Sequence, residues 1–384
     1  MTAIPAATIA APMREALALA ARAVGLSDPN PRVGCVIVAD GTIAGRGHTQ
    51  EAGGPHAEVM ALRDASERGV DVRGATVYVT LEPCAHHGRT PPCADALVAA
   101  GVGRVVIALR DPHALVAGKG AARLESAGIA VEWGGGGSES HALNVGYFSR
   151  IERGRPWLRM KAAISLDGRS ALADGTSQWI TGSAARSDGH AWRRRAGAVL
   201  TGVGTVREDD PRLDVRLVAT ARQPLRVIVD SRLETPLEAR ILQPPGAVLV
   251  YAAVDDTARR AALEQRGAEV VVLPSPTAKV DLTAMLVDLA SRGINELHVE
   301  AGHKLNGSLL REGCVDELLV YLAPSLLGAD SAGMFALAAP ATLDARTRLV
   351  FRSVERVGDD LRVLARMVPA EPVSPAPAPT PSSF

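Results

Sequence analysis

Two successive series of alternating strand-like and helix-like segments constrain the fold of this chain more than any other feature. In the first series, helix-like segments alternate with strand-like ones, and two of these, Val33–Ala39 and Ala75–Leu81, have the apolar sequence typical of strands buried on both faces. The strand candidates are Val33–Ala39, Ala75–Leu81, Arg104–Leu109 and Ile129–Trp133, and the helix candidates are Pro12–Gly25, Ala57–Gly69, Ala94–Gly101 and Ala121–Gly128. This order predicts a mostly parallel sheet covered by helices.

The second series begins at Trp157 and predicts a second α/β domain. Its strand candidates are Leu158–Ile164, Ala198–Thr201, Leu225–Val229, Ala247–Tyr251, Glu269–Leu273, Glu296–Glu300 and Glu317–Leu322. Its helix candidates are Ala184–Arg195, Asp255–Arg266, Leu282–Arg292 and Lys304–Glu312. Two late strand candidates, Leu349–Val357 and Leu361–Val368, predict a terminal hairpin.

A break in the pattern separates the two series. Gly134–Gly137 is a run of four glycines, and a polar helix-like stretch and the basic run Arg150–Arg155 follow it. We therefore predict one domain over residues 1–150 and a second over residues 151–368. Residues 369–384 are rich in Pro, Ala and Ser without aliphatic periodicity, which predicts a disordered tail.

Length and composition restrict the classes of function. At 384 residues the chain is long enough for two or three domains. Lys+Arg and Asp+Glu both number 42, so the formal net charge is +0, which weighs against a DNA or RNA substrate. Aromatic residues make up only 3%, so platforms for stacking bases are not expected.

The same counts bear on the cellular compartment. No stretch of about 20 apolar residues lacks charges and Gly or Pro breaks, so no membrane span is expected, and the N-terminus has no secretory signal pattern. Four cysteines cannot form a disulfide framework in a chain of this length. We therefore expect a soluble, cytoplasmic, multi-domain enzyme.

A set of metal-ligand residues stands in the first series. His56 opens a predicted helix, Cys84 follows a predicted strand, and Cys93 comes nine positions later. These three side chains would supply a zinc ion with three ligands and leave a fourth position for water. Glu58, two residues after His56, would lie beside that water without being a ligand and could carry its proton to a leaving amine. The alternatives are a structural zinc site or a pair of buried thiols.

The sequence around these ligands resembles the zinc nucleobase deaminase signature, a His-x-Glu and a later Pro-Cys-x-x-Cys. The departure is that eight residues rather than two separate the cysteines. The whole segment Leu81–Cys93, with its insert of two histidines and Arg89, is very similar to the deaminase half of the bacterial bifunctional riboflavin-biosynthesis deaminase/reductase family, as is Asp28–Gly34 upstream. That resemblance implies that Asn30 and His48 line a pyrimidine pocket and that the insert meets a ribose phosphate.

Signals for a nucleotide-dependent reductase stand in the second series. Gly202-Val203-Gly204-Thr205 follows a short apolar strand, and a second glycine turn, Gly302–Gly307, follows the strand that ends at Glu300. Backbone N–H groups at such turns can hold a phosphate. Neither turn is a Gly-x-Gly-x-x-Gly fingerprint, so no Rossmann domain is expected. Each turn alone is more often structural than functional.

The order of the motifs strengthens this interpretation. Lys161–Arg169, Ser177–Thr181, Asp209–Pro211 and Val299–Gly302 stand in the order of the reductase domain of the same family. That resemblance implies a fold like dihydrofolate reductase and the cofactor NADPH. With the first half, it implies an α/β protein with a cytidine-deaminase-like zinc domain followed by a dihydrofolate-reductase-like domain.

The resemblance also implies roles for individual residues of the second half. Cofactor contacts are implied for Ala163, Trp179, Thr205, Asp209, Ser231 and the turn Gly302, His303, Lys304, Leu305, Asn306, Gly307 and Ser308. Substrate contacts are implied for Ser177, Arg193, Leu213, Arg216 and Glu300.

Chemistry makes several of these roles plausible. Arg193 and Arg216 are suited to the terminal phosphate of a substrate, and Ser231 follows an apolar strand where it could receive the 2′-phosphate of NADPH. Lys161 and Glu300 are the candidates for proton transfer. The alternatives are a solvated helix charge for Arg193 and core packing for Trp179.

Taken together, the resemblance implies a two-step enzyme of riboflavin biosynthesis. The first step would be zinc-dependent hydrolytic deamination of 2,5-diamino-6-(5-phosphoribosylamino)pyrimidin-4-one. The second would be NADPH-dependent reduction of the ribosyl group, giving 5-amino-6-(5-phosphoribitylamino)uracil. One zinc ion per chain, NADPH and a homo-oligomer, a dimer or tetramer, are expected.

Two other hypotheses remain open at the level of sequence. A stand-alone deaminase of cytidine, guanine or tRNA adenosine would not need the second α/β domain with its ordered motifs. A non-catalytic binding protein, with a structural zinc ion, would not need Glu58 beside an open coordination position. Ammonia release from the pyrimidine, and NADPH consumption when the deaminated product is supplied, distinguish the three.

Overall fold

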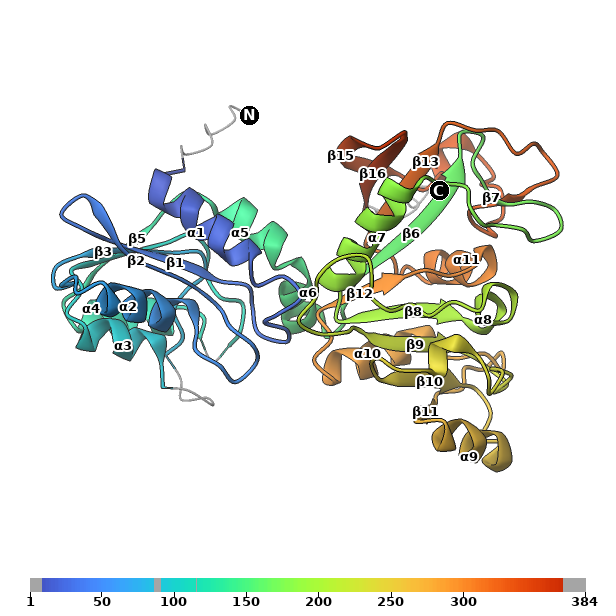
Figure 1. The fold of residues 1–384 in the computed structure, drawn as a ribbon, viewed down its shortest axis with the longest axis horizontal. Helices are drawn as coiled ribbons and strands as arrows, with labels where there is room; N and C mark the ends of the chain where they lie inside the picture. Colours follow the sequence, from blue (N-terminus) through green and yellow to red (C-terminus); the bar gives the residue numbers. More distant parts are fainter. Residues whose placement is uncertain (1–8, 86–90, 115, 369–384) are drawn as a thin grey trace, which may run out of the picture.

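The chain folds into two lobes, each built around its own β-sheet, in a computed structural model that describes residues 9–85, 91–114 and 116–368 (Figure 1). The N-terminal lobe contains a five-stranded sheet and the C-terminal lobe a nine-stranded sheet. The lobes meet at helix α6 (Val145–Arg153), which lies between them (Figure 1).

The sheet of the first lobe has the strand order β2-β1-β3-β4-β5. Its strands are β1 (Gly34–Ala39), β2 (Thr42–His48), β3 (Thr76–Val79), β4 (Arg104–Ile107) and β5 (Ala130–Trp133). Helices cover both faces, with one layer made of α1 (Ala11–Ala21) and α5 (Gly137–Leu143), and the other of α2 (Ala57–Glu67), α3 (Cys93–Ala99) and α4 (Lys119–Ser126) (Figure 1). Most side chains of β1, β3 and β4 belong to the buried core of this sandwich, whereas β5 is largely exposed.

The expectation of a mostly parallel sheet is met by strand direction, since four of the five strands run the same way, but β1 runs against them. β1 runs antiparallel to both β2 and β3, and only the pairs β3–β4 and β4–β5 are parallel. The sequence did not predict β2 because its glycines and Arg46 interrupt the apolar pattern. The glycines are required by close packing, since a Cβ on Gly45 would lie 2.1 Å from the Ala61 carbonyl oxygen and one on Gly47 2.1 Å from that of Ala57, both in α2.

The second sheet has the order β11-β10-β9-β8-β12-β6-β13-β16-β15. The first seven strands in this order are parallel to their neighbours, and the last two pair antiparallel. Their bounds are β6 (Trp157–Ser165), β8 (Ala198–Gly202), β9 (Leu225–Val229), β10 (Val248–Ala252), β11 (Ala268–Val272), β12 (Glu296–Val299), β13 (Glu317–Ala323), β15 (Leu349–Val357) and β16 (Asp360–Met367). Every strand candidate of the second series, including the terminal hairpin, is therefore confirmed.

Helices cover this sheet, and short elements complete the lobe. The remaining elements are α7 (Ser183–Arg195), α8 (Val203–Asp209), α9 (Thr257–Gln265), α10 (Leu282–Ser291), α11 (His303–Arg311), the two-stranded pair β7 (Arg169–Ala171) and β14 (Ala332–Gly333), and the 3₁₀ turns Arg240–Leu242 and Leu343–Ala345. Side chains of α10 and α11 pack into one apolar cluster, and those of α8 and α9 into another.

The topology of the second sheet fixes where a ligand can bind. β8 and β12 are parallel neighbours, but the chain continues from β8 to β9 on one side and from β12 to β13 on the other. In open α/β sheets, such a divergence leaves a crevice outside the carboxyl ends of the two strands, where ligands bind. Helix α8 follows β8 and helix α11 follows β12 at this point.

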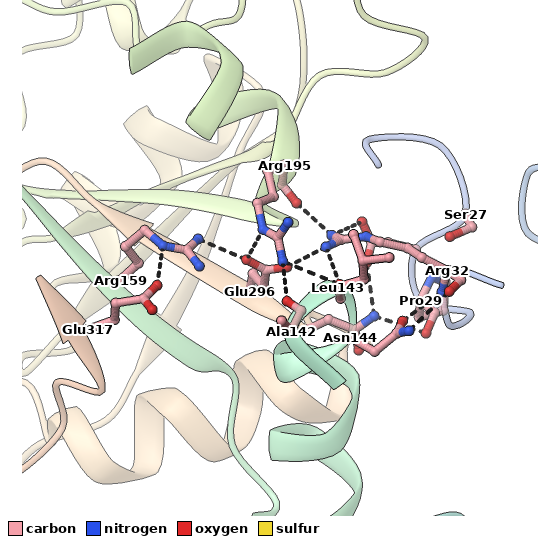
Figure 2. Close-up of polar contacts among 12 residues, drawn as sticks. Ser27, Pro29, Arg32, Ala142, Leu143, Asn144, Arg159, Arg195, Glu296 and Glu317 are labelled. Carbon is pink, nitrogen blue, oxygen red and sulfur yellow. Dashed lines mark hydrogen bonds and ion pairs between the residues drawn. The ribbon is translucent and has the colours of Figure 1, made fainter. Parts of the chain in front are cut away.

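A buried ionic cluster joins the two lobes (Figure 2). Glu296, at the start of β12 and 1% exposed, accepts hydrogen bonds from Arg32 of the first lobe at 2.6 Å and from Arg159 and Arg195 of the second at 2.8 Å each. Arg159 also donates to Glu317 at 2.7 Å. Buried charges need such multiple pairing because their desolvation is costly.

Among the described residues, no helix is long and apolar enough to cross a membrane.

Candidate active sites

The structure brings the three predicted metal ligands of the first lobe together. His56 precedes the first residue of α2, Cys84 lies beyond the end of β3, and Cys93 is the first residue of α3. His56 Nδ1 lies 3.3 Å from Cys93 Sγ and 3.7 Å from Cys84 Sγ. The backbone N–H of Cys93 donates to Cys84 Sγ at 3.3 Å.

This cluster fits a zinc ion. Bonds of about 2.3 Å to sulfur and about 2.0–2.1 Å to nitrogen at tetrahedral angles put ligand atoms roughly 3.5–3.8 Å apart, close to the two distances observed. The neighbouring Cys93, then His56, lower the pKa of the Cys84 thiol, which favours the thiolate that binds metal.

Glu58 lies beside this cluster in the first turn of α2. Its side chain is buried, with 3% of the residue exposed. Burial, and then the nearby Cys84, raise the pKa of Glu58 to about 7. A carboxyl group with a pKa near neutrality can both take and give a proton, as a general acid–base catalyst must.

A cavity of about 450 Å³ opens in front of His56, Glu58 and Cys84. The predicted substrate residue Asn30 lines it, whereas His48, half-buried at the end of β2, lies outside its described wall. Sequence reasoning missed other residues of this wall, among them Glu82, Asp111, His113, Tyr147 and Arg150. Four of these follow β4 or lie on α6, and none of the four belongs to a motif that the sequence analysis assigned to the site.

The insert that carried the family resemblance is only partly covered by the structure. Its residues 86–90, which include both histidines and Arg89, lie outside the described residues. Their expected contact with a ribose phosphate therefore stays a prediction.

The second candidate site centres on Glu300, which directly follows β12. Arg193 of α7 donates to both its carboxylate oxygens, from Nε at 2.5 Å and from Nη2 at 2.9 Å. Lys161 of β6 places Nζ 4.0 Å from Glu300 Oε2. The structure thus gathers three predicted site residues from three separate elements.

The charges of this cluster assign protonation states. Burial raises the pKa of Glu300, but Arg193 and then its other partners lower it further, so the net pKa lies well below the usual range. Burial lowers the pKa of Lys161, and Glu300 partly offsets this. Glu300 is therefore a carboxylate, and Lys161 is the group that can give a proton. Arg193 is bound to Glu300 here, and its expected contact with a substrate phosphate stays a prediction.

The two glycine turns of the sequence are the N-termini of helices. Gly202 ends β8 and α8 begins at Val203, while Gly302 precedes the first residue of α11, which contains the rest of the expected turn. The Gly302 N–H donates to Thr205 Oγ1 at 3.1 Å, so the two helix starts lie side by side. In the described part of the chain, no side chain caps either start. Unbound N–H groups and the positive helix ends there fit the phosphates of a dinucleotide.

Three other predicted residues of the second half, Ser177, Trp179 and Arg216, contact neighbouring polar or charged side chains. Ser177 donates to Asp209 Oδ1 at 3.0 Å, which places a substrate candidate against a cofactor candidate. Trp179 is 68% exposed and lies under the Arg186 guanidinium, so it is not a core residue. Arg216 pairs with Asp214 at 2.6 Å.

Three candidates are tied to the protein itself. Leu213 is buried in an apolar cluster, so only its backbone could meet a substrate. Ser231 Oγ accepts the Val280 N–H at 3.3 Å. Asn306 is buried, and its Nδ2 donates to the Ala301 carbonyl oxygen at 2.9 Å.

The first lobe places a His/Cys/Cys cluster beside a buried glutamate, which defines a zinc-dependent deaminase. The second lobe places two helix starts beside a Lys–Glu–Arg cluster, at the point where the sheet connections diverge. This arrangement defines a nucleotide-dependent reductase. Comparison with known families agrees. Residues 7–109 match the cytidine and deoxycytidylate deaminase zinc-binding region, and residues 156–363 match the RibD C-terminal domain. The chain belongs to the RibD family of riboflavin biosynthesis proteins.

Relatives cover nearly the whole chain. The riboflavin biosynthesis protein RibD of Escherichia coli is 44% identical over 361 residues, which are 91% of this chain and 96% of the relative. The RibD structure from Acinetobacter baumannii is 42% identical with a TM-score of 0.84, covering 93% of this chain and 98% of the other. A Thermotoga maritima structure, a diaminohydroxyphosphoribosylaminopyrimidine deaminase/5-amino-6-(5-phosphoribosylamino)uracil reductase, is 32% identical with a TM-score of 0.83 and the same coverage.

These findings confirm the expected family, fold class, bifunctional activity and cofactors. The chain is a deaminase and reductase of riboflavin biosynthesis, with a zinc site in the first lobe and an NADPH-dependent reductase in the second.

Proposed function

We propose specific roles for the residues of the two sites. In the first lobe, His56, Cys84 and Cys93 hold the zinc ion, and Asn30 binds the pyrimidine in the cavity. Bound zinc supplies the Lewis acidity that lets water attack carbon at neutral pH. Glu58 takes the proton from the attacking water and gives it to the departing amine, so that ammonia leaves and a carbonyl group forms.

The single observation that carries the deaminase assignment is the buried carboxyl group of Glu58 next to the His/Cys/Cys cluster. A structural zinc site has no use for such a group. The cavity in front of it has room for a pyrimidine with its ribose.

In the second lobe we propose that Lys161 is the proton donor. Bound NADPH supplies the hydride that the anomeric carbon gains. As that carbon is reduced, its bond to the ring oxygen breaks, and the ring oxygen takes a proton from the Lys161 ammonium group. Glu300 holds Lys161 in its charged form, and Arg193 fixes Glu300.

The remaining residues bind the two ligands. We propose that Arg216 and Ser177 hold the substrate, with the backbone of Leu213. The cofactor lies at the carboxyl ends of β8 and β12, against Ala163, Trp179, Thr205, Asp209, Ser231 and the residues from Gly302 to Ser308.

Mass analysis of the reaction products tests this scheme. Purified protein is incubated with the phosphorylated diaminopyrimidinone, with and without NADPH. We expect the deaminated ribosyl compound and ammonia in both cases, and the ribityl compound only with NADPH. Formation of a reduced but still aminated product would contradict the proposed order of the steps.

We also propose where the first domain ends. The two family matches leave residues 110–155 unassigned, and α6 continues unbroken through residue 150 to Arg153. The boundary is therefore better placed at the turn after α6, where Gly154 adopts a φ of 66°.

Finally, we propose that the protein is a homo-oligomer in the cytoplasm. β15 is an edge strand that exposes Val350, Phe351 and Val354, with 70% of Phe351 accessible. Unpaired apolar edges of this kind are sites of association. Phe351→Glu should lower the mass measured by sedimentation, and an unchanged mass would remove this surface from the interface. Free cysteines that bind metal suit a reducing compartment.

A further inference from the structure

The second lobe holds part of the deaminase cavity in place. The cavity wall includes the loop of Pro29, Asn30 and Pro31. Asp28, just before this loop, accepts hydrogen bonds from Asn295 at 2.9 Å and from Arg222 at 2.6 Å. Both donors belong to the second lobe, so the position of this loop depends on contacts between the lobes.

Asn295 makes the central contacts of this junction. It directly precedes β12 and is 3% exposed. Its Nδ2 donates to Asp28 Oδ1 and to the Pro29 carbonyl oxygen at 3.0 Å, and its Oδ1 accepts from Arg150 Nε at 2.6 Å. The whole amide group is therefore used to hold two parts of the cavity wall, the loop and helix α6.

Arg150 presents a positive charge at this cavity. It lies on the face of α6 that also brings Tyr147 and Ile151 to the wall, and it is the one arginine or lysine among the described lining residues. Its Nε is bound to Asn295, and its Nη2 donates to the Pro29 carbonyl oxygen at 3.2 Å. For Nη1, the described part of the chain provides no hydrogen-bond acceptor.

Among the residues that the structure describes, no carboxylate neutralises this guanidinium group at close range. Within the described residues, no acidic side chain lies within 4.0 Å of Arg150, whereas most arginines near the junction are paired. Two acidic residues of the wall have other partners: Glu82 accepts hydrogen bonds from the N–H groups of Gly118 and Ala121, and Asp111 accepts one from the Tyr147 hydroxyl. A fixed cation with a free N–H edge is suited to an anionic part of a ligand.

We propose that Arg150 binds the phosphate group of the substrate during deamination, and that Asn295, supplied by the second lobe, is the positioning residue that holds Arg150. This inference rests on the proposed function of the first lobe. It means that the deaminase site is incomplete without the second lobe, although all the zinc ligands lie in the first.

The test compares two substrates on the full-length zinc protein. Ammonia release is measured with the phosphorylated pyrimidine and with its dephosphorylated nucleoside, for Arg150→Gln, Arg150→Lys and Asn295→Ala. Loss of a charge-assisted hydrogen bond should raise KM for the phosphorylated substrate about 10–100-fold in Arg150→Gln. KM for the nucleoside should change little, so the preference for phosphate should fall by the same factor.

The other two variants should show smaller changes in KM for the phosphorylated substrate. Arg150→Lys retains the charge and should recover part of the preference. Asn295→Ala leaves Arg150 in the protein but unanchored, so its KM for the phosphorylated substrate should rise about 3–10-fold. Because Asn295 contacts none of the groups proposed to take part in the reaction, kcat at saturating substrate should stay close to that of the wild type.

Two controls separate this effect from misfolding. Arg104→Gln removes an exposed arginine at the start of β4, the opposite end of that strand from Asp111, and should keep the preference for phosphate. Zinc content and the reductase half-reaction should be normal in every variant. An equal rise of KM for both substrates, or an unchanged preference in Arg150→Gln, would overturn the inference. Absence of ammonia release from either substrate by the wild-type protein would overturn the proposed function instead.

Discussion

At the scale of single residues, substitutions of the neighbouring Glu58 and Cys84 should have different effects. We expect Glu58→Gln to keep its zinc and to lose ammonia release by about 10²–10⁴-fold, because a proton carrier is gone but no ligand is. Cys84→Ser should lose both zinc and activity. Metal analysis together with an ammonia assay checks this, and near-normal deamination by Glu58→Gln would remove it from the reaction.

Replacements at Glu300 and Lys161 should affect the second lobe alone. Glu300→Gln and Lys161→Ala are each expected to depress reduction, by about 10²–10⁴-fold for Lys161→Ala, and to leave deamination unchanged. Both half-reactions should be followed at saturating NADPH. Matched losses in the two half-reactions would indicate a folding defect, and unchanged reduction in both variants would exclude these residues from the site.

The pH dependence of reduction should report on Lys161. A general acid must be protonated, so reduction should fall as pH rises through the Lys161 pKa, which burial lowers from its usual range. Glu300 raises that pKa. Glu300→Gln should therefore move the alkaline limb of the pH–rate profile to lower pH. A limb that stays in place would separate Glu300 from the proton donor.

Residue types at short spacing could be predicted from sequence, whereas contacts between distant residues could not. Residue type and spacing together predict metal binding or proton transfer for His56, Glu58, Cys84 and Cys93. Asn295 has no motif, and the Arg150 it holds is 145 residues away in the chain.

At the scale of elements, strands with continuous apolar sequence were predictable and glycine-rich segments were not. β9 and β10 match their predicted ranges within one residue because both faces of each are covered. β2 was missed because its glycines serve packing against α2. The two glycine turns turned out to begin helices, since glycine is tolerated at helix starts as well as in loops.

The ionic cluster at β12 should matter more than its exposed counterparts. Burial raises the pKa of Glu296, but Arg195, Arg32 and Arg159 together hold it well below the usual range. Glu296→Gln leaves three arginines without their shared carboxylate and should destabilise by roughly 3–5 kcal/mol. The matched control Glu132→Gln, in an exposed pair with Arg104, should cost about 0–1 kcal/mol. Urea unfolding midpoints compare the two, and similar shifts would mean that the cluster adds no stability.

Acid should weaken the same cluster. Because the pKa of Glu296 is depressed in the folded protein, its contribution to stability is fully present above the pKa of an unfolded glutamate, about 4.3. That contribution is lost as pH falls toward the lower, folded value. The difference in unfolding midpoint between the wild-type protein and Glu296→Gln should therefore shrink at acid pH.

At the scale of the whole molecule, the described fold ends before the last residues of the chain. β16 ends at Met367, and the Val368 N–H donates to the Arg348 carbonyl oxygen. Deletion of residues 369–384 removes none of these contacts and should leave both activities intact. Assays of both half-reactions on the truncated protein check this, and loss of either one would show that the segment has a role.

β12 and the residues that flank it have a consequence for how genes of this family can recombine. Asn295 and Glu296, at one end of the strand, face partners in the deaminase half, while Glu300 at the other end serves the reductase. A chimera that joins halves from two relatives would therefore work fully only where the incoming half restores both the Asn295–Arg150 and the Glu296–Arg32 pairs. Selection for these pairs would keep the two halves inherited as a unit, even if they were encoded as separate chains.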